Sequence, residues 1–380
     1  MLNKIKVMTV FGTRPEAIKM APLVLELEKN AQIESIVTVT GQHREMLDQV
    51  LEIFGVTPDY DLNIMKARQT LVDVTTNALQ GLDEVIKKVK PDIVLVHGDT
   101  TTTFIAGLAA FYNQVKVGHV EAGLRTWNKY SPFPEEMNRQ LTGVLADLNF
   151  APTAKSANNL LEENKKEDSI FITGNTAIDA LKTTVVEGYE HPIFEELGSD
   201  KLILLTAHRR ENLGSPMRNM FKAIRRIVEE RTDIKVIYPV HLNPAVREAA
   251  NDIFGDNPRV QLIEPLDVKD FHNFMNRAHI ILTDSGGVQE EAPSLGKPVL
   301  VMRDTTERPE GIDAGTLKLA GTNEETIYSL INELLDQQSV YQAMSKASNP
   351  YGDGHASKRI VDAILYYFNV TNEKPSHFKA

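Results

Sequence analysis

Acidic side chains at three places in the sequence could carry acid–base chemistry. Asp99 and Glu121 each follow an apolar run, and Glu135 and Glu136 begin a predicted helix after a proline-rich loop. Carboxylates gathered in a partly closed site raise one another's pKa, so that one can hold a proton while another accepts one. Structural alternatives exist, since Asp99 could cap the next helix and the two glutamates could stabilise a helix start. We favour acid–base chemistry because three separate motifs supply the same group.

Basic side chains at the ends of other apolar runs could bind a phosphate. His208, Arg209 and Arg210 follow one another, and three cations in a row repel unless an anion or an acid lies among them. This arrangement favours a functional site. Arg14 lies at the first strand-to-helix turn and Lys19 about one turn further on. Both could neutralise a phosphate or a leaving group, although Lys19 taken alone is more typical of a surface lysine.

A glycine-containing turn would suit a diphosphate. The motif Ser285-Gly286-Gly287 opens a predicted helix at 288–294, where free backbone N–H groups attract anions and glycine permits close approach. A plain tight turn is the alternative. Glu291 could accept hydrogen bonds from ribose hydroxyls or be a solvated helix residue. Arg308 could clamp an anion or pair with a neighbouring glutamate.

These residues are positioned by an alternation of short apolar runs and helical stretches. The runs are continuous and rich in Val, Ile and Leu, which is typical of strands buried on both faces of a parallel sheet. We expect strands at Ile5–Phe11, Ile36–Val39, Ile93–Val96, Val115–Val120, Ile170–Thr173, Leu202–Thr206, Val236–Val240, Val260–Ile263, Ile280–Thr283 and Val299–Met302. We expect helices at Pro15–Lys29, Leu71–Lys88, Thr102–Tyr112, Glu135–Ala146, Ala177–Val186, Met217–Glu230, Glu324–Leu335 and Ala356–Phe368. This alternation predicts an α/β fold, in which ligands bind outside the carboxyl ends of the strands.

A turn-rich stretch divides the strand pattern in two. Gly188–Asp200 is expected to be of mixed structure and rich in turns, and the strand pattern restarts at Lys201. We therefore predict two Rossmann-like domains, 1–174 and 175–355, facing each other across a cleft of the GT-B type. The last helix could belong to either domain, and we assign the segment 356–380 to the first. Residues 372–380 are expected to form a frayed tail.

The composition excludes several classes of protein. The length of 380 residues exceeds the ~250–300 at which a single core stops growing. The formal net charge of −11 makes the chain a poor general binder of nucleic acid or of anionic membranes. The absence of cysteine excludes disulfides and Cys-ligated zinc. No apolar run is long enough to cross a bilayer, so we expect a soluble cytoplasmic protein.

The signatures of common cofactors are missing. No Gly-x-Gly-x-x-Gly follows a predicted strand, so NAD binding has no support. The phosphate-binding loop of nucleotide hydrolases is absent, because Pro298 follows Gly296-Lys297. There is no His-Glu-x-x-His and no acidic loop of the calcium type. We therefore predict neither a cofactor nor a metal.

An ordered set of motifs resembles the bacterial non-hydrolysing UDP-N-acetylglucosamine 2-epimerases. The resemblance extends from the first strand to residues 349–354, and its motifs show no departure from the family pattern at the positions named below. The motifs are Val10–Lys19, His97–Thr100, His119–Arg125, Pro134–Arg139, His208–Asn212, Thr283–Glu291 and Arg303–Glu310. Each motif alone is modest support, whereas the ordered set is specific.

The resemblance implies roles for individual residues, a homodimer, and UDP-GlcNAc, UDP-ManNAc and UDP as ligands. The implied catalytic residues are Asp99, Glu121, Glu135 and His208. The implied substrate contacts are Arg14, Lys19 and Arg139 in the first domain and Phe271, Ser285, Gly286, Gly287, Glu291 and Arg308 in the second, where UDP would bind. A second UDP-GlcNAc, acting as an activator, would contact Gln42, His43, Arg68, Gln69 and His241.

The implied reaction is reversible epimerisation at C2 of UDP-GlcNAc, which would supply UDP-ManNAc for cell-surface polysaccharide. The C2 proton is not next to a carbonyl, so simple deprotonation would leave a poorly stabilised carbanion. Elimination of UDP to a glycal, followed by re-addition, instead needs a base, an acid and cations for the leaving group. The alternatives are a hydrolysing 2-epimerase that releases ManNAc and UDP, a GT-B glycosyltransferase, and a regulatory protein that binds the nucleotide sugar without turnover.

Overall fold

The computed structural model describes residues 4–41, 44–64 and 69–380, which form two compact units. Unit 1 contains the residues up to Thr183 and the segment Gly352–Lys379, and unit 2 contains Thr184–Tyr351. The division therefore lies further along the chain than the boundary after residue 174 that the sequence suggests. The reason is local: Asp179 on α7 (Thr176–Thr184) accepts hydrogen bonds from the backbone of Ala356 and Ser357, at 3.1 and 2.8 Å.

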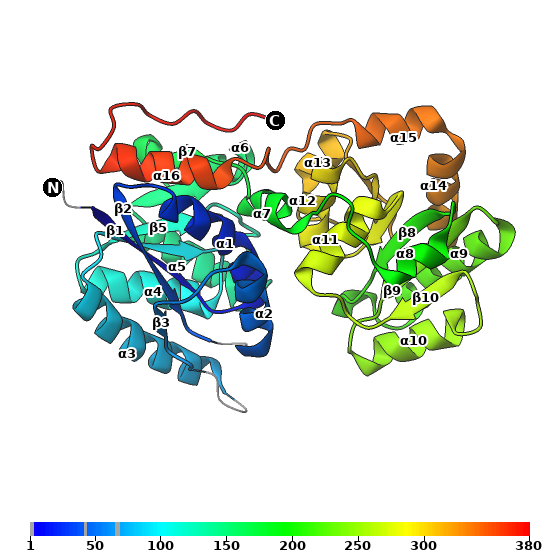
Figure 1. Ribbon diagram of the computed structural model, residues 1–380, viewed down its shortest axis with the longest axis horizontal. Coiled ribbons are helices and arrows are strands. Elements are labelled where there is room, and N and C mark those ends of the chain that lie inside the picture. The colour runs from blue at the N-terminus through cyan, green and yellow to red at the C-terminus, as the bar shows by residue number, and fades with distance from the viewer. Residues whose placement is uncertain (1–3, 42–43, 65–68) are drawn as a thin grey trace. The chain divides into compact units, whose positions relative to one another are not determined.

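Unit 1 is built on a sheet whose strand pairs are all parallel, in the order β3-β2-β1-β4-β5-β6-β7 (Figure 1). The strands are β1 (Ile5–Phe11), β2 (Ile33–Val39), β3 (Tyr60–Asp61), β4 (Ile93–His97), β5 (Lys116–Val120), β6 (Leu148–Ala151) and β7 (Ile170–Ile172). The direction in which strands are added reverses between β1 and β4. In open α/β sheets, ligands bind at the carboxyl ends of the strands beside such a reversal.

The helices of unit 1 lie on both faces of this sheet. They are α1 (Arg14–Glu28), α2 (Arg44–Phe54), α3 (Leu71–Val89), α4 (Thr101–Tyr112), α5 (Glu135–Leu145), α6 (Ala154–Glu162), α7 and α16 (Ala356–Tyr367), with a 3₁₀ turn at Glu167–Ser169. One core cluster joins α3 and α4 to the central strands and includes Leu82, Ala106 and Val96, all fully buried. Buried apolar area of this kind is the main favourable term in holding helices against a sheet.

Unit 2 repeats the plan with the order β10-β9-β8-β11-β12-β13, again with parallel pairs. The strands are β8 (Lys201–Thr206), β9 (Ile234–Pro239), β10 (Val260–Ile263), β11 (Ile280–Thr283), β12 (Val299–Val301) and β13 (Leu317–Leu319). The helices are α8 (Pro192–Leu197), α9 (Ser215–Glu230), α10 (Pro244–Phe254), α11 (Val268–Arg277), α12 (Gly286–Glu291), α13 (Pro309–Asp313), α14 (Glu324–Asp336) and α15 (Gln338–Ser345), with 3₁₀ turns at Arg210–Asn212 and Ala292–Leu295. The reversal here lies between β8 and β11.

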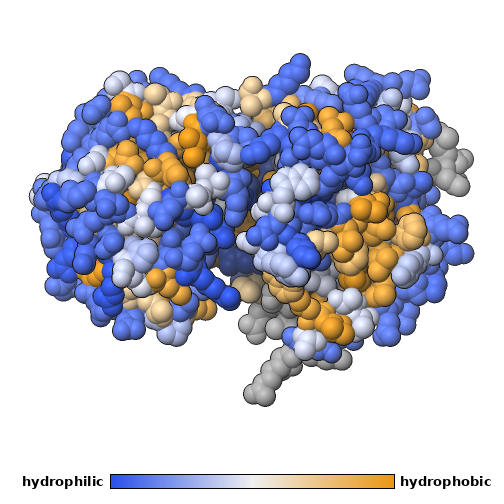
Figure 2. All heavy atoms as spheres, turned by 180° about the vertical axis from the view of Figure 1, so that it is seen from behind, coloured by the Kyte–Doolittle hydropathy of each residue, from blue (hydrophilic) through white to orange (hydrophobic). Residues whose placement is uncertain are grey.

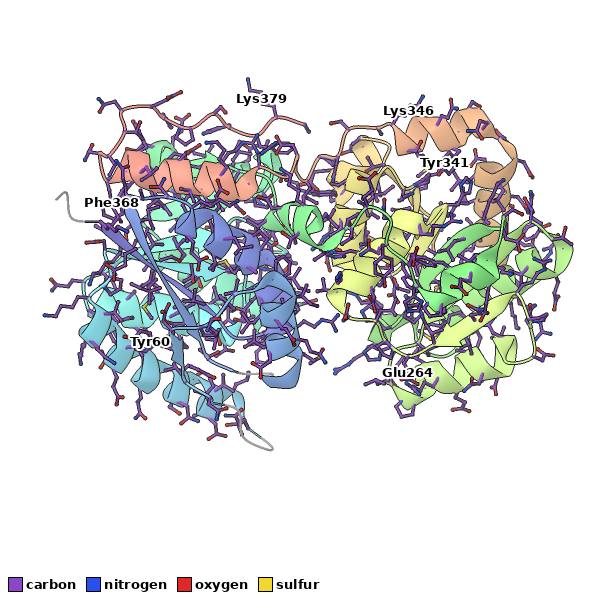
Figure 3. The ribbon with its side chains drawn as sticks, viewed as in Figure 1. Tyr60, Glu264, Tyr341, Lys346, Phe368 and Lys379 are labelled. Atoms are coloured by element: carbon purple, nitrogen blue, oxygen red, sulfur yellow. The ribbon has the colours of Figure 1, made fainter. Side chains whose placement is uncertain are left out.

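Aromatic contacts fasten the outer elements of both units. The Phe221 ring on α9 packs 5.5 Å from Tyr238 of β9 and 5.0 Å from Phe254 of α10. On α15, Tyr341 stacks on His279 with ring centroids 4.2 Å apart (Figure 3). In unit 1, the Lys88 ammonium lies 5.0 Å from the centre of the Tyr60 ring, on the edge strand β3 (Figure 3).

The predicted α/β class and its two Rossmann-like sheets are confirmed, as is every predicted strand to within a few residues. The sequence pattern did not predict the strands β3, β6 and β13 or the helices α2, α6, α8, α10, α11, α13 and α15. The stretch Gly188–Asp200 contains the short helix α8 between turns. The expectation of a frayed C-terminal tail was wrong, because the tail packs on unit 1: Phe378 is buried, and its N–H donates to the Ile172 carbonyl at 2.7 Å.

One surface of unit 1 is apolar. Figure 2 shows hydrophobic side chains gathered on this unit, and Phe111, Tyr112, Leu141 and Val144 of α4 and α5 are all exposed. We call these four residues the α4–α5 apolar face. In the described part of the chain, no helix has both the length and the apolar character that crossing a membrane requires.

Candidate functional site

In each unit, several of the residues singled out from the sequence follow the strands beside the reversal of strand order. In unit 1 the turns after β1 and β4 are linked through the buried Glu16, whose carboxylate accepts hydrogen bonds from the backbone of Gly12 and Thr13 and from the Thr100 hydroxyl. Thr13 also caps α1 in a capping box with Glu16. These contacts fix the edge of the sheet from which Lys19 and Asp99 extend.

Glu121 is the centre of the first cluster. Its Oε2 atom forms an ion pair with Lys19, accepts a hydrogen bond from Asn175 Nδ2 at 3.0 Å and lies 3.8 Å from His97 Nε2. The backbone φ of Glu121 is +62°, a left-handed conformation that is uncommon for residues other than glycine and is often found at functional sites. Lys19 is largely buried in this pair, so its interpretation as a surface lysine is wrong.

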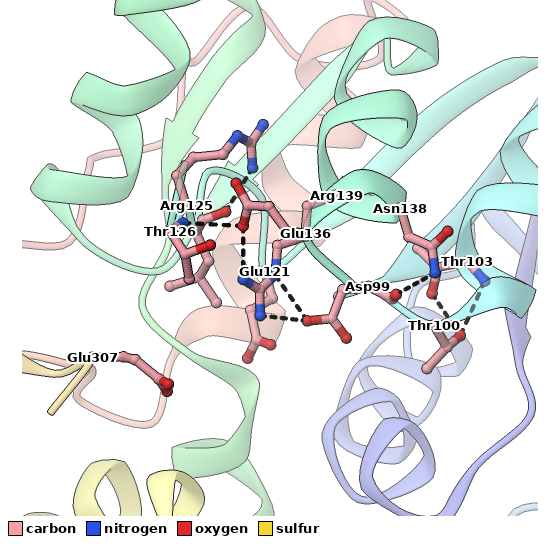
Figure 4. A network of polar contacts seen from close by, with 12 residues as sticks. Asp99, Thr100, Thr103, Glu121, Arg125, Thr126, Glu136, Asn138, Arg139 and Glu307 are labelled. Carbon is pink, nitrogen blue, oxygen red and sulfur yellow. Dashed lines mark hydrogen bonds and ion pairs between the residues drawn. The ribbon is translucent and has the colours of Figure 1, made fainter. Parts of the chain in front are cut away.

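Asp99 is held by α5. Its Oδ2 atom lies 2.8 Å from Arg139 Nε and 2.6 Å from Arg139 Nη2, and its backbone carbonyl accepts a hydrogen bond from Asn138 Nδ2 at 2.9 Å (Figure 4). The alternative interpretation of Asp99 as a helix cap is wrong, because Thr100 caps α4 by accepting from the Thr103 N–H.

Two adjacent glutamates on α5 differ in what they contact. Glu136 is buried and binds the preceding loop, accepting hydrogen bonds from the backbone of Thr126 and Trp127 (Figure 4). Burial opposes ionisation of Glu136, but these hydrogen bonds and one from Gln140 leave its pKa lowered. Glu136 is therefore a structural carboxylate. Glu135 Oε2 is buried and accepts no hydrogen bond from the described residues, and Glu135 shares a helix face with Arg139, four residues on.

In unit 2, the buried Asp284 organises the end of β8. Its carboxylate accepts hydrogen bonds from the N–H groups of His208 and Arg209, both at 2.9 Å, and from Asn212 Nδ2 at 3.1 Å. Its Oδ1 atom also lies 3.4 Å from His208 Nδ1. An acid therefore does lie among the three consecutive basic residues, as the sequence pattern requires.

His208 stacks on His241, with ring centroids 5.4 Å apart and an angle of 15° between the rings. Burial lowers the pKa of His208; Asp284 opposes this shift and His241 adds to it. The imidazole is therefore neutral near pH 7 and able to accept a proton. The structure thus places His241, implied by the resemblance for a second site, directly against the implied catalytic histidine.

The turn after β11 contains Ser285 and leads directly into α12, which begins at Gly286. Ser285 N–H donates to Thr283 Oγ1 at 2.9 Å, and Gln289 Nε2 donates back to the Ser285 carbonyl at 3.0 Å. A Cβ atom added to Gly286 would lie only 3.0 Å from the Arg308 guanidinium carbon, so a side chain at this position would displace the guanidinium slightly. Arg308 also pairs with Glu307 and with Glu290, at 2.9 Å each.

Two further residues that the resemblance implies as UDP contacts, Glu291 and Phe271, also lie on unit 2. Glu291 Oε2 is 3.6 Å from His272 Nε2, and His272 Nδ1 is 2.6 Å from the Thr184 hydroxyl. Phe271 is half-buried on α11 beside His272. The described residues contain no group of three or more metal-binding side chains.

The residues implied for a second ligand are only partly described. Gln42, His43 and Arg68 lie outside the described residues. In unit 1, the Gln69 side chain donates to the Ile64 carbonyl. Arg14 is half-buried at the first position of α1.

Comparison with known proteins identifies the family. A family model described as UDP-N-acetylglucosamine 2-epimerase matches residues 25–365. The UDP-N-acetylglucosamine 2-epimerase of Bacillus subtilis is 70% identical over 377 residues, which are 99% of each chain. This chain belongs to the UDP-N-acetylglucosamine 2-epimerase family. The family resemblance of the sequence motifs is thereby confirmed.

Solved structures of epimerases agree with the fold. The putative UDP-N-acetylglucosamine 2-epimerase from Listeria monocytogenes has a TM-score of 0.95 and 62% identity, covering 99% of this chain and 100% of that one. The UDP-GlcNAc 2-epimerase from Neisseria meningitidis, solved bound to UDP-GlcNAc, has a TM-score of 0.86 and 51% identity, covering 95% of this chain and 100% of that one.

Several residues that contact the predicted site residues were not themselves predicted as members of the site. Asp284, Asn175 and Asn138 contact the predicted groups directly. Asp284 and Asn138 lie within motifs that were recognised, so the motif itself could have indicated them. Asn175 lies just before α7, and no local pattern distinguishes it.

Proposed function

We propose that this chain interconverts UDP-GlcNAc and UDP-ManNAc without releasing free sugar. The observation that carries the proposal is the pair of carboxylates on unit 1. Asp99 and Glu121 are each held by a cation, Arg139 and Lys19, at the edge where parallel sheets bind ligands. Family membership supports the same substrate.

The proposed reaction is an elimination followed by an addition. A base removes the C2 proton, the electrons of the C2–H bond form a C1=C2 double bond, and the C1–O electrons leave with UDP. UDP then adds back to C1 of the glycal, and an acid returns a proton to the opposite face of C2. Two acid–base groups are needed because the proton leaves one face and returns to the other.

We assign the proton transfers to Asp99, Glu121 and Glu135, together with His208. A carboxylate that an ion pair already holds in one orientation loses little side-chain conformational entropy when substrate binds, which is the basis of preorganised catalysis. The neutral His208 is suited to accept a proton or to donate a hydrogen bond. Arg14, Lys19 and Arg139 would contact the substrate from unit 1.

We assign UDP binding to unit 2. Ser285-Gly286-Gly287 offers backbone N–H groups to the diphosphate, with Arg308 supplying positive charge. Glu291 would accept from the ribose hydroxyls, and Phe271 would contact UDP. A relative from Methanocaldococcus jannaschii, 34% identical, was solved in complex with UDP-GlcNAc and UDP.

We further propose the second UDP-GlcNAc site and the homodimer that the resemblance implies. The second site would use Gln42, His43, Arg68, Gln69 and His241 and would act as an activator. The homodimer would form through the α4–α5 apolar face. The product would serve the synthesis of cell-surface polysaccharide.

The proposal is tested by proton NMR of UDP-GlcNAc with the enzyme in D2O. UDP-ManNAc should appear, and deuterium should enter at C2 of both nucleotide sugars as the reaction approaches equilibrium. Turnover with full retention of the C2 proton would exclude the elimination route. Free ManNAc with UDP would identify a hydrolysing epimerase, and no change without an added acceptor would favour a glycosyltransferase.

A further inference from the structure

Three consecutive backbone carbonyls, at the last residue of β4 and in the turn that follows it, each accept a hydrogen bond from a side chain of a different element. The His97 carbonyl accepts from the Thr103 hydroxyl on α4. The Gly98 carbonyl lies 2.7 Å from His119 Nε2 on β5, and the Asp99 carbonyl lies 2.9 Å from Asn138 Nδ2 on α5. Figure 4 shows Thr103, Asn138 and Arg139 around Asp99.

The turn needs this support because of its backbone conformation. Gly98 has a φ of +65°, and its N–H donates to the Val120 carbonyl at 2.9 Å. A glycine in this conformation is otherwise freer than any other residue. The side-chain donors therefore supply the restraint that glycine lacks.

His119 is suited to this task because it is fully buried and neutral. Burial lowers its pKa to about 4, so the ring is uncharged near neutral pH. The contact with a carbonyl requires the hydrogen on Nε2. Nδ1 is buried and accepts no hydrogen bond from the described residues, so the ring has one engaged nitrogen, and it faces the turn.

We propose that His119 and Asn138 are positioning residues that fix the main chain of Asp99 and thereby aim its carboxylate. Asn138 and Arg139 are adjacent on α5, so one helix holds the Asp99 backbone and the Asp99 carboxylate. His119, on the neighbouring strand β5, holds the carbonyl of Gly98, the residue before Asp99. The inference rests on the proposed function, in which Asp99 transfers a proton.

The test compares His119→Leu with His119→Gln. Leucine removes the donor, whereas the amide nitrogen of glutamine can replace Nε2. We expect His119→Leu to lower kcat by roughly 10- to 100-fold, because small misplacements of a catalytic group are costly. KM and UDP affinity should change by less than about threefold, and His119→Gln should restore most of kcat. Asn138→Ala should behave like His119→Leu and serves as the second variant if His119→Leu does not fold.

Asn149→Leu is the matched control. Asn149 pairs with His119 in the sheet register and is fully buried, and its side-chain atoms make no hydrogen bond to the described residues. Removing its polarity perturbs the same layer without touching the turn, so kcat should stay within about twofold of the parent.

A double-mutant cycle with Asp99→Asn separates positioning from a purely structural role. If His119 acts through Asp99, His119→Leu should cause little further loss once Asp99 is already disabled. Three results would overturn the inference. The first is that the losses of kcat in His119→Leu and Asp99→Asn multiply in the double variant. The others are a normal kcat in both His119→Leu and Asn138→Ala, or a loss of kcat in Asn149→Leu equal to that in His119→Leu. If Asp99→Asn itself turned over normally, the assignment of Asp99 in the proposed function would fail instead.

Discussion

Both guanidinium contacts of Arg139 with Asp99 fall on the same carboxylate oxygen. Arg139 Nε and Nη2 lie 2.8 and 2.6 Å from Asp99 Oδ2, so Oδ1 is not engaged by the arginine. A pair of this geometry orients the carboxylate and leaves one oxygen for proton transfer. Glu121 is also held by a cation and an amide, since its Oε2 atom contacts Lys19 and Asn175.

We predict that Asp99→Asn, Glu121→Gln and His208→Asn each lower turnover by roughly 10²- to 10⁴-fold. Each substitution removes a proton acceptor or donor and nearly conserves the shape of the side chain. UDP binding, measured by calorimetry, should be largely intact because the proposed UDP contacts are other residues.

The control for this set is Glu28→Gln, an equivalent loss of a carboxylate at an exposed position of α1. It should leave turnover unchanged. Near-normal turnover in all three site variants would mean that the acid–base groups are other residues.

The role of Arg308 can be tested separately. Its ion pairs with Glu290 and Glu307 are compatible with a purely structural role and with binding of an anion. We expect Arg308→Gln to weaken UDP binding about 10- to 100-fold, the range for loss of a charge-assisted hydrogen bond. Glu307→Gln removes one of its acidic partners, at 2.9 Å, and should leave binding the same or tighter. Calorimetric titration with UDP decides the question: equal affinity in Arg308→Gln and the parent would assign Arg308 to structure alone.

The sequence predicted the strands well because they are continuous runs of buried Val, Ile and Leu. It missed β6 because the run Leu148-Asn149-Phe150-Ala151 is short and carries a polar residue. It missed β3 because a strand of two residues is too short to show a hydrophobic pattern. The predicted site residues were recognisable because parallel strands bring their carboxyl ends to one edge.

The supporting residues could not be predicted in the same way. His119 and Asn138 act through contacts with a turn that lies 21 and 39 positions away in the sequence. Local patterns do not carry such pairings. For Glu135 and Glu136, only the fold distinguishes them, since both begin the same helix and Glu136 alone binds the loop.

The buried histidines predict how stability depends on pH. Burial lowers the pKa of His97 and of His119 to about 4, from the ordinary value of 6.5. Between these values the unfolded chain binds more protons, so the free energy of unfolding should fall as the pH falls from about 6.5 to about 4. At about 1.4 kcal/mol for each pKa unit, each histidine contributes up to about 3 kcal/mol.

Unfolding by urea at pH 7 and at pH 5 measures this effect. Glu16 acts in the opposite direction, because burial raises its pKa, so the informative quantity is the difference between the parent and His119→Gln. The variant should lose less stability between the two pH values than the parent. An identical loss would show that His119 does not titrate with the depressed pKa.

The final prediction concerns the α4–α5 apolar face as a contact between two copies of the chain. Val144 is 72% exposed and Phe111 is 58% exposed. Helix α4 contains no charged residue, and neither does the second half of α5, from Gln140 to Leu145. With a net charge of −11, two copies repel each other overall, and an uncharged apolar face adds no further repulsion where they meet. A two-fold axis would place the same face on both sides of the contact.

Val144→Asp should therefore shift the protein from dimer to monomer in sedimentation velocity, because it would bury two carboxylates in the contact. Val370→Asp makes the same change at an exposed valine outside the face and should remain a dimer. A parent protein that sediments as a monomer, or dimers in both variants, would contradict this assignment of the face.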